Sequence, residues 1–90
     1  MEIPKAIRGF FDGDKIKQWP GKLAKKTLCL EYLAEKIEAG KEFSDTEIKE
    51  AINEWITFGD PVTVRRELIE AKVLDRSPDG RTYWKVEKEG

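Results

Sequence analysis

A helix-start signal at residues 43–48, "FSDTEI", constrains the fold more than any other feature. It contains a capping box, in which the Ser44 hydroxyl accepts from the Glu47 amide and the Glu47 carboxylate accepts from the Ser44 amide. Phe43 and Ile48 add a hydrophobic staple around the cap. Apolar residues then recur at helical spacing, which predicts a helix from Ser44 to the break at "TFGDP". The buried face comprises Ile48, Ala51, Ile52, Trp55 and Ile56.

The helix that begins at Ser44 is the second of three predicted helices. The third follows shortly after it, over roughly Pro61 to Lys72. Gly59 ends the preceding helix, Asp60 is a good N-cap, and Pro61 suits the first helical position. A connection of about four residues between the two helices is typical of a helix-turn-helix. We expect the third helix to bury Val64, Leu68 and Ala71. The outer side carries Thr63, Arg66 and Glu70, with Arg65 on the flank and Val62, Ile69 and Val73 also turned outward.

Strand-like residues end the chain. The segments "VLDRS" and "RTYWKVE" are joined by "PDG", which is a sound turn sequence. A short strand over 41–43 is also expected. The predicted elements are, in order, a helix, a short strand, a helix, a turn, a helix and a hairpin. This order predicts an α+β fold of the winged helix-turn-helix type. Its three-helix core carries a C-terminal β-hairpin wing over 74–86.

The first half of the chain provides the remaining helix. It follows Pro20 and is expected to end at Gly40, with one apolar face made of Leu23, Leu30, Leu33, Ala34 and Ile37. Leu28 and Tyr32 form a second apolar side, so two surfaces need covering. Residues 1–20 contain aromatic residues around an Asp12-Gly13 turn. We expect an arm or short hairpin over 1–20 that packs on a winged-helix domain spanning 21–90.

Composition excludes several classes of function. The chain has no His and a single cysteine, Cys29, and it shows no metal-spaced cluster, nucleophile–base pair or glycine-rich phosphate loop. We therefore expect no catalytic residue, metal or cofactor, and no enzyme activity. One cysteine and no apolar run long enough for a membrane span favour a cytoplasmic protein without a membrane partner.

Charge is unevenly distributed although the net value is only −1. Residues 1–26 carry seven basic and three acidic side chains, residues 27–60 three and nine, and residues 61–90 seven and six. Local fields rather than net charge decide whether nucleic acid binds, so basic ends around an acidic middle are compatible with DNA. In helix-turn-helix proteins the second helix enters the major groove. The candidate DNA-binding residues are Thr63, Arg65 and Arg66 there, Arg76 and Arg81 on the wing, and Lys22, Lys25 and Lys26 on the first helix.

The stretches "FSDTEI", "VRRELIE" and "LDR…DG…YW" together resemble a bacterial family of unknown function, DUF2087, from about Trp19 to Lys85. That family is also found fused to regulators of the ArsR type. The resemblance implies a winged-helix-like domain linked to transcription, without assigning an activity. Related sequences tend to have Gly where this chain has Lys72. If that position needs a left-handed conformation, Lys costs up to ~1 kcal/mol relative to Gly there.

Two readings of function remain open. The first is a DNA-binding domain of a transcription regulator, acting as a homodimer because one small module buries little surface on DNA. The second is a protein–protein interaction module that keeps the winged-helix scaffold without binding DNA. The low net charge and the outward Val62, Ile69 and Val73 favour this alternative.

Overall fold

The computed structural model describes residues 3–86 and contains one 3₁₀ helix, three α-helices and five short strands within them. In chain order the elements are η1 (Lys5–Phe10), β1 (Phe11–Asp12), β2 (Lys15–Ile16), α1 (Leu23–Lys36), β3 (Glu42–Ser44), α2 (Asp45–Asn53), α3 (Pro61–Glu70), β4 (Leu74–Arg76) and β5 (Thr82–Lys85).

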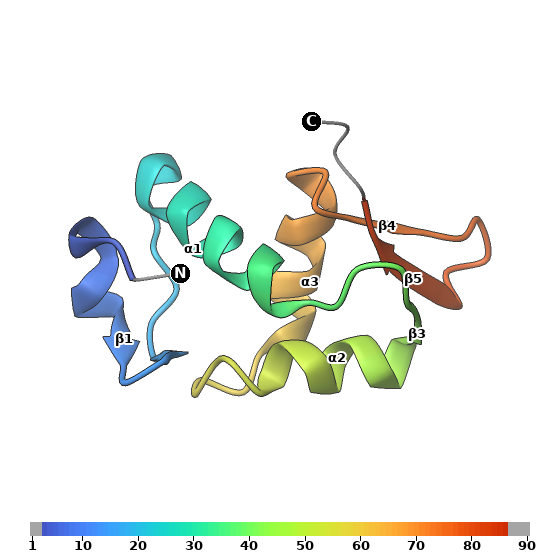
Figure 1. Ribbon diagram of the computed structural model, residues 1–90, viewed down its shortest axis with the longest axis horizontal. Helices are drawn as coiled ribbons and strands as arrows, with labels where there is room; N and C mark the ends of the chain where they lie inside the picture. Colours follow the sequence, from blue (N-terminus) through green and yellow to red (C-terminus); the bar gives the residue numbers. More distant parts are fainter. Residues whose placement is uncertain (1–2, 87–90) are drawn as a thin grey trace.

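The helices and the larger sheet form a small α+β domain of winged-helix type (Figure 1). The strand β5 lies between β3 and β4 and is antiparallel to both, with Tyr83 opposite Phe43 on one side and Arg76 on the other. The β4–β5 hairpin projects at one end of the molecule, and the N-terminal segment lies at the other end (Figure 1). The wing is therefore a hairpin anchored to the body by the strand that precedes α2.

The predicted capping box of α2 is confirmed. The Glu47 amide donates to the Ser44 hydroxyl at 3.1 Å, and the Ser44 amide donates to the Glu47 carboxylate at 2.9 Å. The end of this helix was predicted wrongly. α2 stops at Asn53, so Trp55 and Ile56 lie beyond it, and the connection to α3 spans residues 54–60 instead of about four residues.

The N-terminal segment accounts for the early end of α2. The Ile16 amide donates to the Trp55 carbonyl at 2.8 Å, and the Thr57 amide donates to the Ile16 carbonyl at 2.9 Å, which forms a parallel bridge between Ile16 and Ile56. Backbone groups that another helical turn would use are thus bonded to β2. Tertiary pairing here overrides the local helical pattern.

α3 begins as its sequence predicts and ends in a strained conformation. Asp60 caps it through the Thr63 amide, and Pro61 occupies the first turn. At the other end, the Val73 amide donates to the Leu68 carbonyl at 2.9 Å and the Lys72 amide to the Ile69 carbonyl at 3.1 Å. This is a Schellman motif, in which the residue after the cap is usually glycine. Lys72 occupies that position with φ of 65°. Ala71, predicted to be buried, is the exposed C-cap residue.

α1 is shorter than predicted but is covered on two sides as expected. It ends at Lys36, because the backbone turns extended at Ile37 and places that side chain in the core at 4% exposure. Leu23, predicted on the buried face, is 77% exposed. On the second apolar side, Tyr32 packs edge-on against Phe11 with ring centroids 4.9 Å apart.

The N-terminal hairpin is part of the core and not a detached arm. Gly13 adopts φ of 64° in the tight turn between β1 and β2, as the Asp-Gly sequence predicts. The Tyr32 hydroxyl donates to the Asp14 carbonyl at 2.6 Å. One contiguous cluster joins this hairpin to the helices and the sheet. Its buried members are Ile7, Phe11, Ile16, Cys29, Leu30, Tyr32, Leu33, Ile37, Phe43, Ile48, Ile52, Ile56, Val64, Leu68, Leu74 and Tyr83.

Candidate nucleic-acid interface

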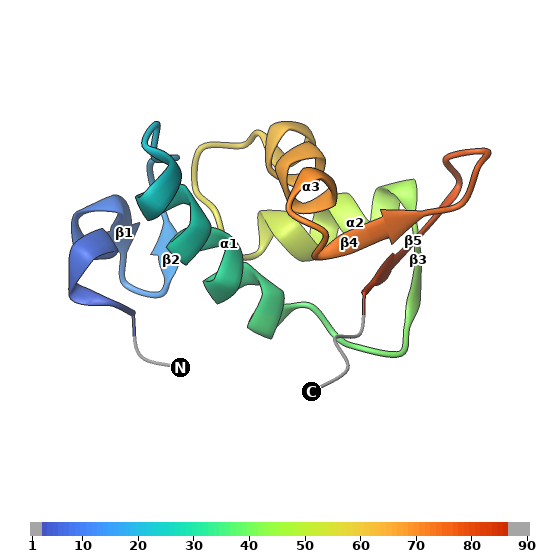
Figure 2. The same cartoon turned by 90° about the horizontal axis from the view of Figure 1, so that it is seen from above.

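Three elements with exposed basic residues reach the same edge of the molecule. Seen from above, the start of α1, the helix α3 and the turn of the β4–β5 hairpin all lie along one side (Figure 2). In a winged-helix protein a recognition helix flanked by a wing is the arrangement that contacts DNA. The predicted DNA-binding residues should therefore lie along this edge.

The outer side of α3 is more polar than its sequence suggested. Ile69 and Val73 are partly buried and pack against the core, so only Val62, at 38% exposure, remains an exposed apolar residue there. Arg66 is exposed, and it forms no ion pair with any residue that the structure describes. The Thr63 hydroxyl donates to the Asp60 carboxylate at 2.7 Å. α3 thus presents one available guanidinium beside a hydroxyl held at the helix start.

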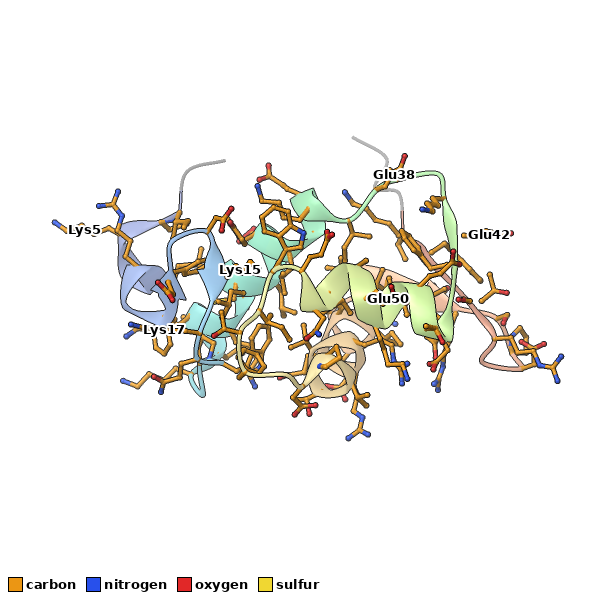
Figure 3. All side chains as sticks on the ribbon, turned by 90° about the horizontal axis from the view of Figure 1, so that it is seen from below. Lys5, Lys15, Lys17, Glu38, Glu42 and Glu50 are labelled. Atoms are coloured by element: carbon orange, nitrogen blue, oxygen red, sulfur yellow. The ribbon has the colours of Figure 1, made fainter. Side chains whose placement is uncertain are left out.

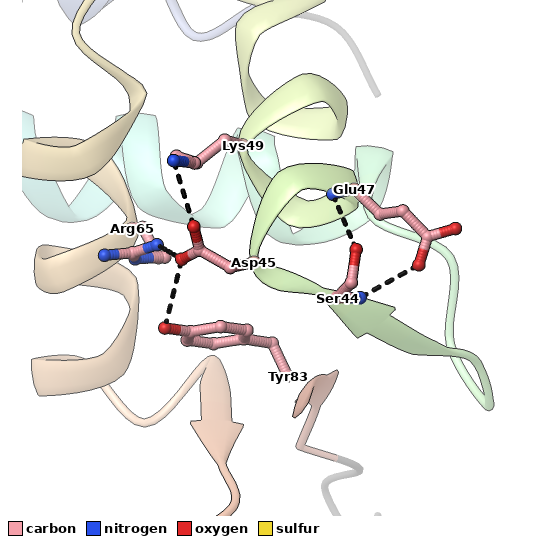
Figure 4. A network of polar contacts seen from close by, with 6 residues as sticks. All are labelled: Ser44, Asp45, Glu47, Lys49, Arg65 and Tyr83. Carbon is pink, nitrogen blue, oxygen red and sulfur yellow. Dashed lines mark hydrogen bonds and ion pairs between the residues drawn. The ribbon is translucent and has the colours of Figure 1, made fainter. Parts of the chain in front are cut away.

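Arg65 is occupied within the domain. Its guanidinium forms an ion pair with Asp45 of α2 and lies 5.1 Å from the ring centroid of Tyr83 in β5 (Figure 4). Lys49 also pairs with Asp45 at 2.9 Å. The hydrogen bond from Lys49, with the charge of Arg65 added, holds the pKa of Asp45 below its usual value. Arg65 therefore joins α3 to α2 and the sheet.

Glu67 holds the other flank of α3. One of its carboxylate oxygens pairs with the Lys26 ammonium at 2.9 Å, and the other accepts from the indole N–H of Trp19. Both ion-pair partners are largely covered, with side-chain exposures of 25% for Lys26 and 20% for Glu67. Lys26 is therefore engaged in a contact between α1 and α3.

The wing carries two exposed arginines, Arg76 and Arg81, beside a hydrogen-bonded turn. The Ser77 hydroxyl donates to the Asp79 carboxylate at 2.5 Å, and the Arg81 amide donates to the same oxygen at 3.1 Å. These bonds lower the pKa of Asp79 and keep it ionised. Gly80 closes the turn with φ of 71°. The turn presents both guanidinium groups, but Asp79 beside them reduces the local positive potential.

The remaining lysines lie at the start of α1. Lys22 is the exposed N-cap residue, and Lys25 is half-buried with its ammonium 5.5 Å from the Phe10 ring centroid. Of the eight predicted site residues, four are exposed cations without an ion pair among the described residues: Lys22, Arg66, Arg76 and Arg81.

Sequence reasoning missed Asp45 and Glu67, the two carboxylates that hold α3 in place. No local spacing signals these contacts, because Asp45 lies 20 residues from Arg65 and Trp19 lies 48 residues from Glu67. Only the packing of α3 against α1 and α2 brings the groups together.

The described part of the chain gives little support for a metal site, a reactive thiol or a membrane-spanning helix. No group of three His, Cys, Asp or Glu side chains within residues 3–86 could hold a metal ion. Cys29 is fully buried, and burial raises the pKa of its thiol to about 11. Residues 3–86 also include no helix that is both long and apolar enough to cross a membrane.

The fold and this edge define a small α+β winged-helix domain. The chain belongs to the bacterial family described as "uncharacterized protein conserved in bacteria (DUF2087)", whose model matches residues 15–85. Neither the comparison with curated proteins nor the comparison with solved structures found a match.

Proposed function

We propose that this domain binds DNA as part of a cytoplasmic, transcription-regulator type protein, with α3 as the recognition helix and β4–β5 as the wing. The observation that carries the proposal is that α3 and the β4–β5 hairpin lie along one side of the molecule (Figure 2) and that α3 contains the exposed Arg66 and the hairpin the exposed Arg76 and Arg81. A planar guanidinium on a recognition helix matches the two acceptors of guanine, and cations at a wing suit phosphates.

Roles within this site differ between neighbouring residues. Arg66 is the base-reading or phosphate-binding residue of α3, and Lys22, Arg76 and Arg81 contact phosphate. Arg65 and Lys26 support the helix rather than contact DNA, because withdrawing Arg65 would break its ion pair with Asp45, and withdrawing Lys26 would break its ion pair with Glu67.

Four available cations predict modest, salt-sensitive affinity. Each phosphate neutralised by a cation contributes about −0.9 to the slope of log K against log salt, so four contacts give a slope of about −3.6. Asp60, Glu70, Asp75 and Asp79 on the same elements weaken the field. One 90-residue module therefore binds tightly only when two copies occupy two half-sites.

Fluorescence anisotropy with a labelled random-sequence duplex at low salt tests the proposal directly. We expect saturable binding whose affinity falls with salt at the slope given above. Absence of binding at low salt would exclude DNA as the ligand, because phosphate contacts alone give measurable affinity.

The adjacent arginines provide a matched pair of variants. Arg66→Ala should weaken binding and reduce the magnitude of the salt slope by about 1, with little change in stability. Arg65→Ala should lower the free energy of unfolding and leave the slope unchanged, because Arg65 pairs with Asp45. If Arg65→Ala weakened duplex binding and Arg66→Ala lowered only the stability, our assignment of roles to these two arginines would be wrong.

A protein–protein interaction module is the second candidate. It is favoured by the acidic segment 27–60 and by exposed Leu23 at 77% and Val62 at 38%. Size-exclusion chromatography with the variants Leu23→Ser and Val62→Ser separates the two functions. If a variant no longer forms a complex that the parent protein forms, but binds duplex as the parent does, the substituted surface serves protein–protein interaction.

A further inference from the structure

Charged side chains of opposite sign gather in opposite halves of the molecule. We call the exposed cations Lys5, Arg8, Lys15 and Lys17 of the N-terminal segment the basic end, and the exposed carboxylates Glu42, Glu47, Glu50 and Glu54 around α2 the acidic face. Figure 3 shows Lys5 and Lys17 at one end, and Glu42 and Glu38 at the other. The long axis of the chain measures 36 Å. Lys5 and Glu42 lie at opposite ends, whereas Lys15 and Glu54 lie where the two surfaces adjoin, because the Ile16 amide donates to the Trp55 carbonyl.

Most of these charges have no partner within the domain. None of the eight forms an ion pair with another residue of the described range 3–86. Glu47 accepts from the Ser44 amide as part of the α2 cap, and this bond lowers the pKa of its carboxyl. Asp12 and Asp14 lie in the basic end, and they reduce its charge from +4 to +2. Both surfaces keep a net charge of opposite sign.

The acidic face is hollowed, and its lining fits a lysine side chain. A hollow of about 540 Å³ is lined by Phe43 and Ala51, with Glu47, Glu50 and Glu54 among its other lining residues. Apolar groups near carboxylates suit a side chain with an apolar stem and a cationic head.

The chain provides its own example of this contact. Lys41, from the same hollow, holds its ammonium 5.1 Å from the Phe43 ring centroid. A second lysine, supplied from outside the domain, would meet the carboxylates of Glu47, Glu50 and Glu54, because Phe43 is largely buried and its ring already faces Lys41.

We propose that the acidic face binds the basic end of a second copy of this chain. The basic end is a cationic occupant that is present whenever the protein is, and its lysines match the hollow. The net charge of −1 leaves little overall repulsion between copies, which favours association. Nucleic acid does not fit the acidic face, because its phosphates would be repelled there.

The proposed contact joins two different surfaces, so it is heterologous. Such contacts continue from copy to copy unless the rotation closes a ring. The average mass should therefore rise steadily with protein concentration and not stop at a dimer. The contact is independent of the edge proposed to bind DNA.

Sedimentation velocity of nucleic-acid-free protein over a range of concentrations tests the contact. We expect the mean sedimentation coefficient to rise with concentration at about 10 mM salt and to stay at the monomer value at about 1 M, where the Debye length falls from about 30 Å to about 3 Å. A monomer at every concentration in low salt would overturn the proposal.

Charge-reversal variants identify the surfaces. Lys15→Glu with Lys17→Glu reverses the basic end, and Glu50→Lys with Glu54→Lys reverses the acidic face without touching the capping box. Each double variant alone should remain monomeric, and an equimolar mixture should associate again. A folding defect cannot produce that recovery. Association that survives either reversal, or a mixture that stays monomeric, would overturn the assignment.

Duplex titration of the same variants keeps the two proposals separate. We expect the Lys15→Glu, Lys17→Glu variant to bind duplex within about twofold of the parent protein. If it loses duplex binding and the parent shows no self-association, the basic end serves DNA and our inference fails. If the parent binds no duplex but associates as described, the DNA proposal fails alone.

Discussion

Replacing Lys72 with glycine should make this domain more stable. Lys72 has φ of 65° at the end of α3, in the left-handed region where a Cβ atom crowds the following carbonyl. Its backbone amide donates to the Ile69 carbonyl, and the next amide donates to the Leu68 carbonyl. Glycine can keep both bonds without the steric cost. The lysine side chain is exposed, so its loss removes no buried contact.

Two opposing free-energy terms set the size of the stability gain expected for Lys72→Gly. The left-handed conformation costs a non-glycine residue about 1–2 kcal/mol. Glycine makes the unfolded chain more flexible, which costs about 0.4–1 kcal/mol of stability. The difference predicts a gain of about 0.7 kcal/mol for Lys72→Gly. For a domain of this size that corresponds to a rise of about 4 °C in Tm, since 1 kcal/mol shifts Tm by roughly 4–8 °C.

Urea unfolding followed by circular dichroism measures the effect, with a higher midpoint and an unchanged m value expected. Lys72→Ala is the first control, because it removes the side chain but retains the Cβ atom, and it should leave the midpoint nearly unchanged. Ala71→Gly is the second control. Ala71 has φ of −81°, so glycine there should lower the midpoint. If Lys72→Gly were no more stable than Lys72→Ala, the strain argument would be refuted.

Three further predictions follow from contacts in the body of the domain. Ser44→Ala removes the α2 cap and should lower the free energy of unfolding by about 1 kcal/mol, measured by urea unfolding; an unchanged midpoint would contradict the capping role. The pKa values of Asp45, Glu47 and Asp79 are lowered in the folded state, so the stability that they contribute is present above their unfolded values and is lost as pH falls through the folded ones. The urea midpoint should accordingly fall as pH drops below about 4.5, less steeply in Glu47→Gln, and a midpoint independent of pH would contradict this. Because burial raises the pKa of Cys29 to about 11, its thiol should react with a disulfide reagent at pH 8 only after denaturant is added, as absorbance at the released thiolate would show.

The resemblance to the bacterial family DUF2087 was confirmed by the family match, and the fold class was confirmed by the sheet and helices. The DNA-binding role remains a prediction. The structure narrows the candidate DNA-binding residues on α3, because Arg66 is exposed whereas the neighbouring Arg65 pairs with Asp45.

Local chemistry alone determined where α2 and α3 begin and where the wing turns. The bonds involved join residues a few positions apart, such as Ser44 with Glu47 and Asp60 with Thr63, so the amino-acid order is sufficient to specify them. The Lys72 conformation also has a local cause, because the Schellman motif requires a left-handed residue after α3.

Tertiary structure decided where α2 ends and which cations remain without an ion pair among the described residues. α2 stops early because Ile16, far away in the sequence, bonds to the backbone of Trp55 and Thr57. Arg65 is paired because α2 places Asp45 beside α3. These contacts depend on how distant segments pack, and the periodicity of a single segment carries no information about a partner that approaches from elsewhere in the chain.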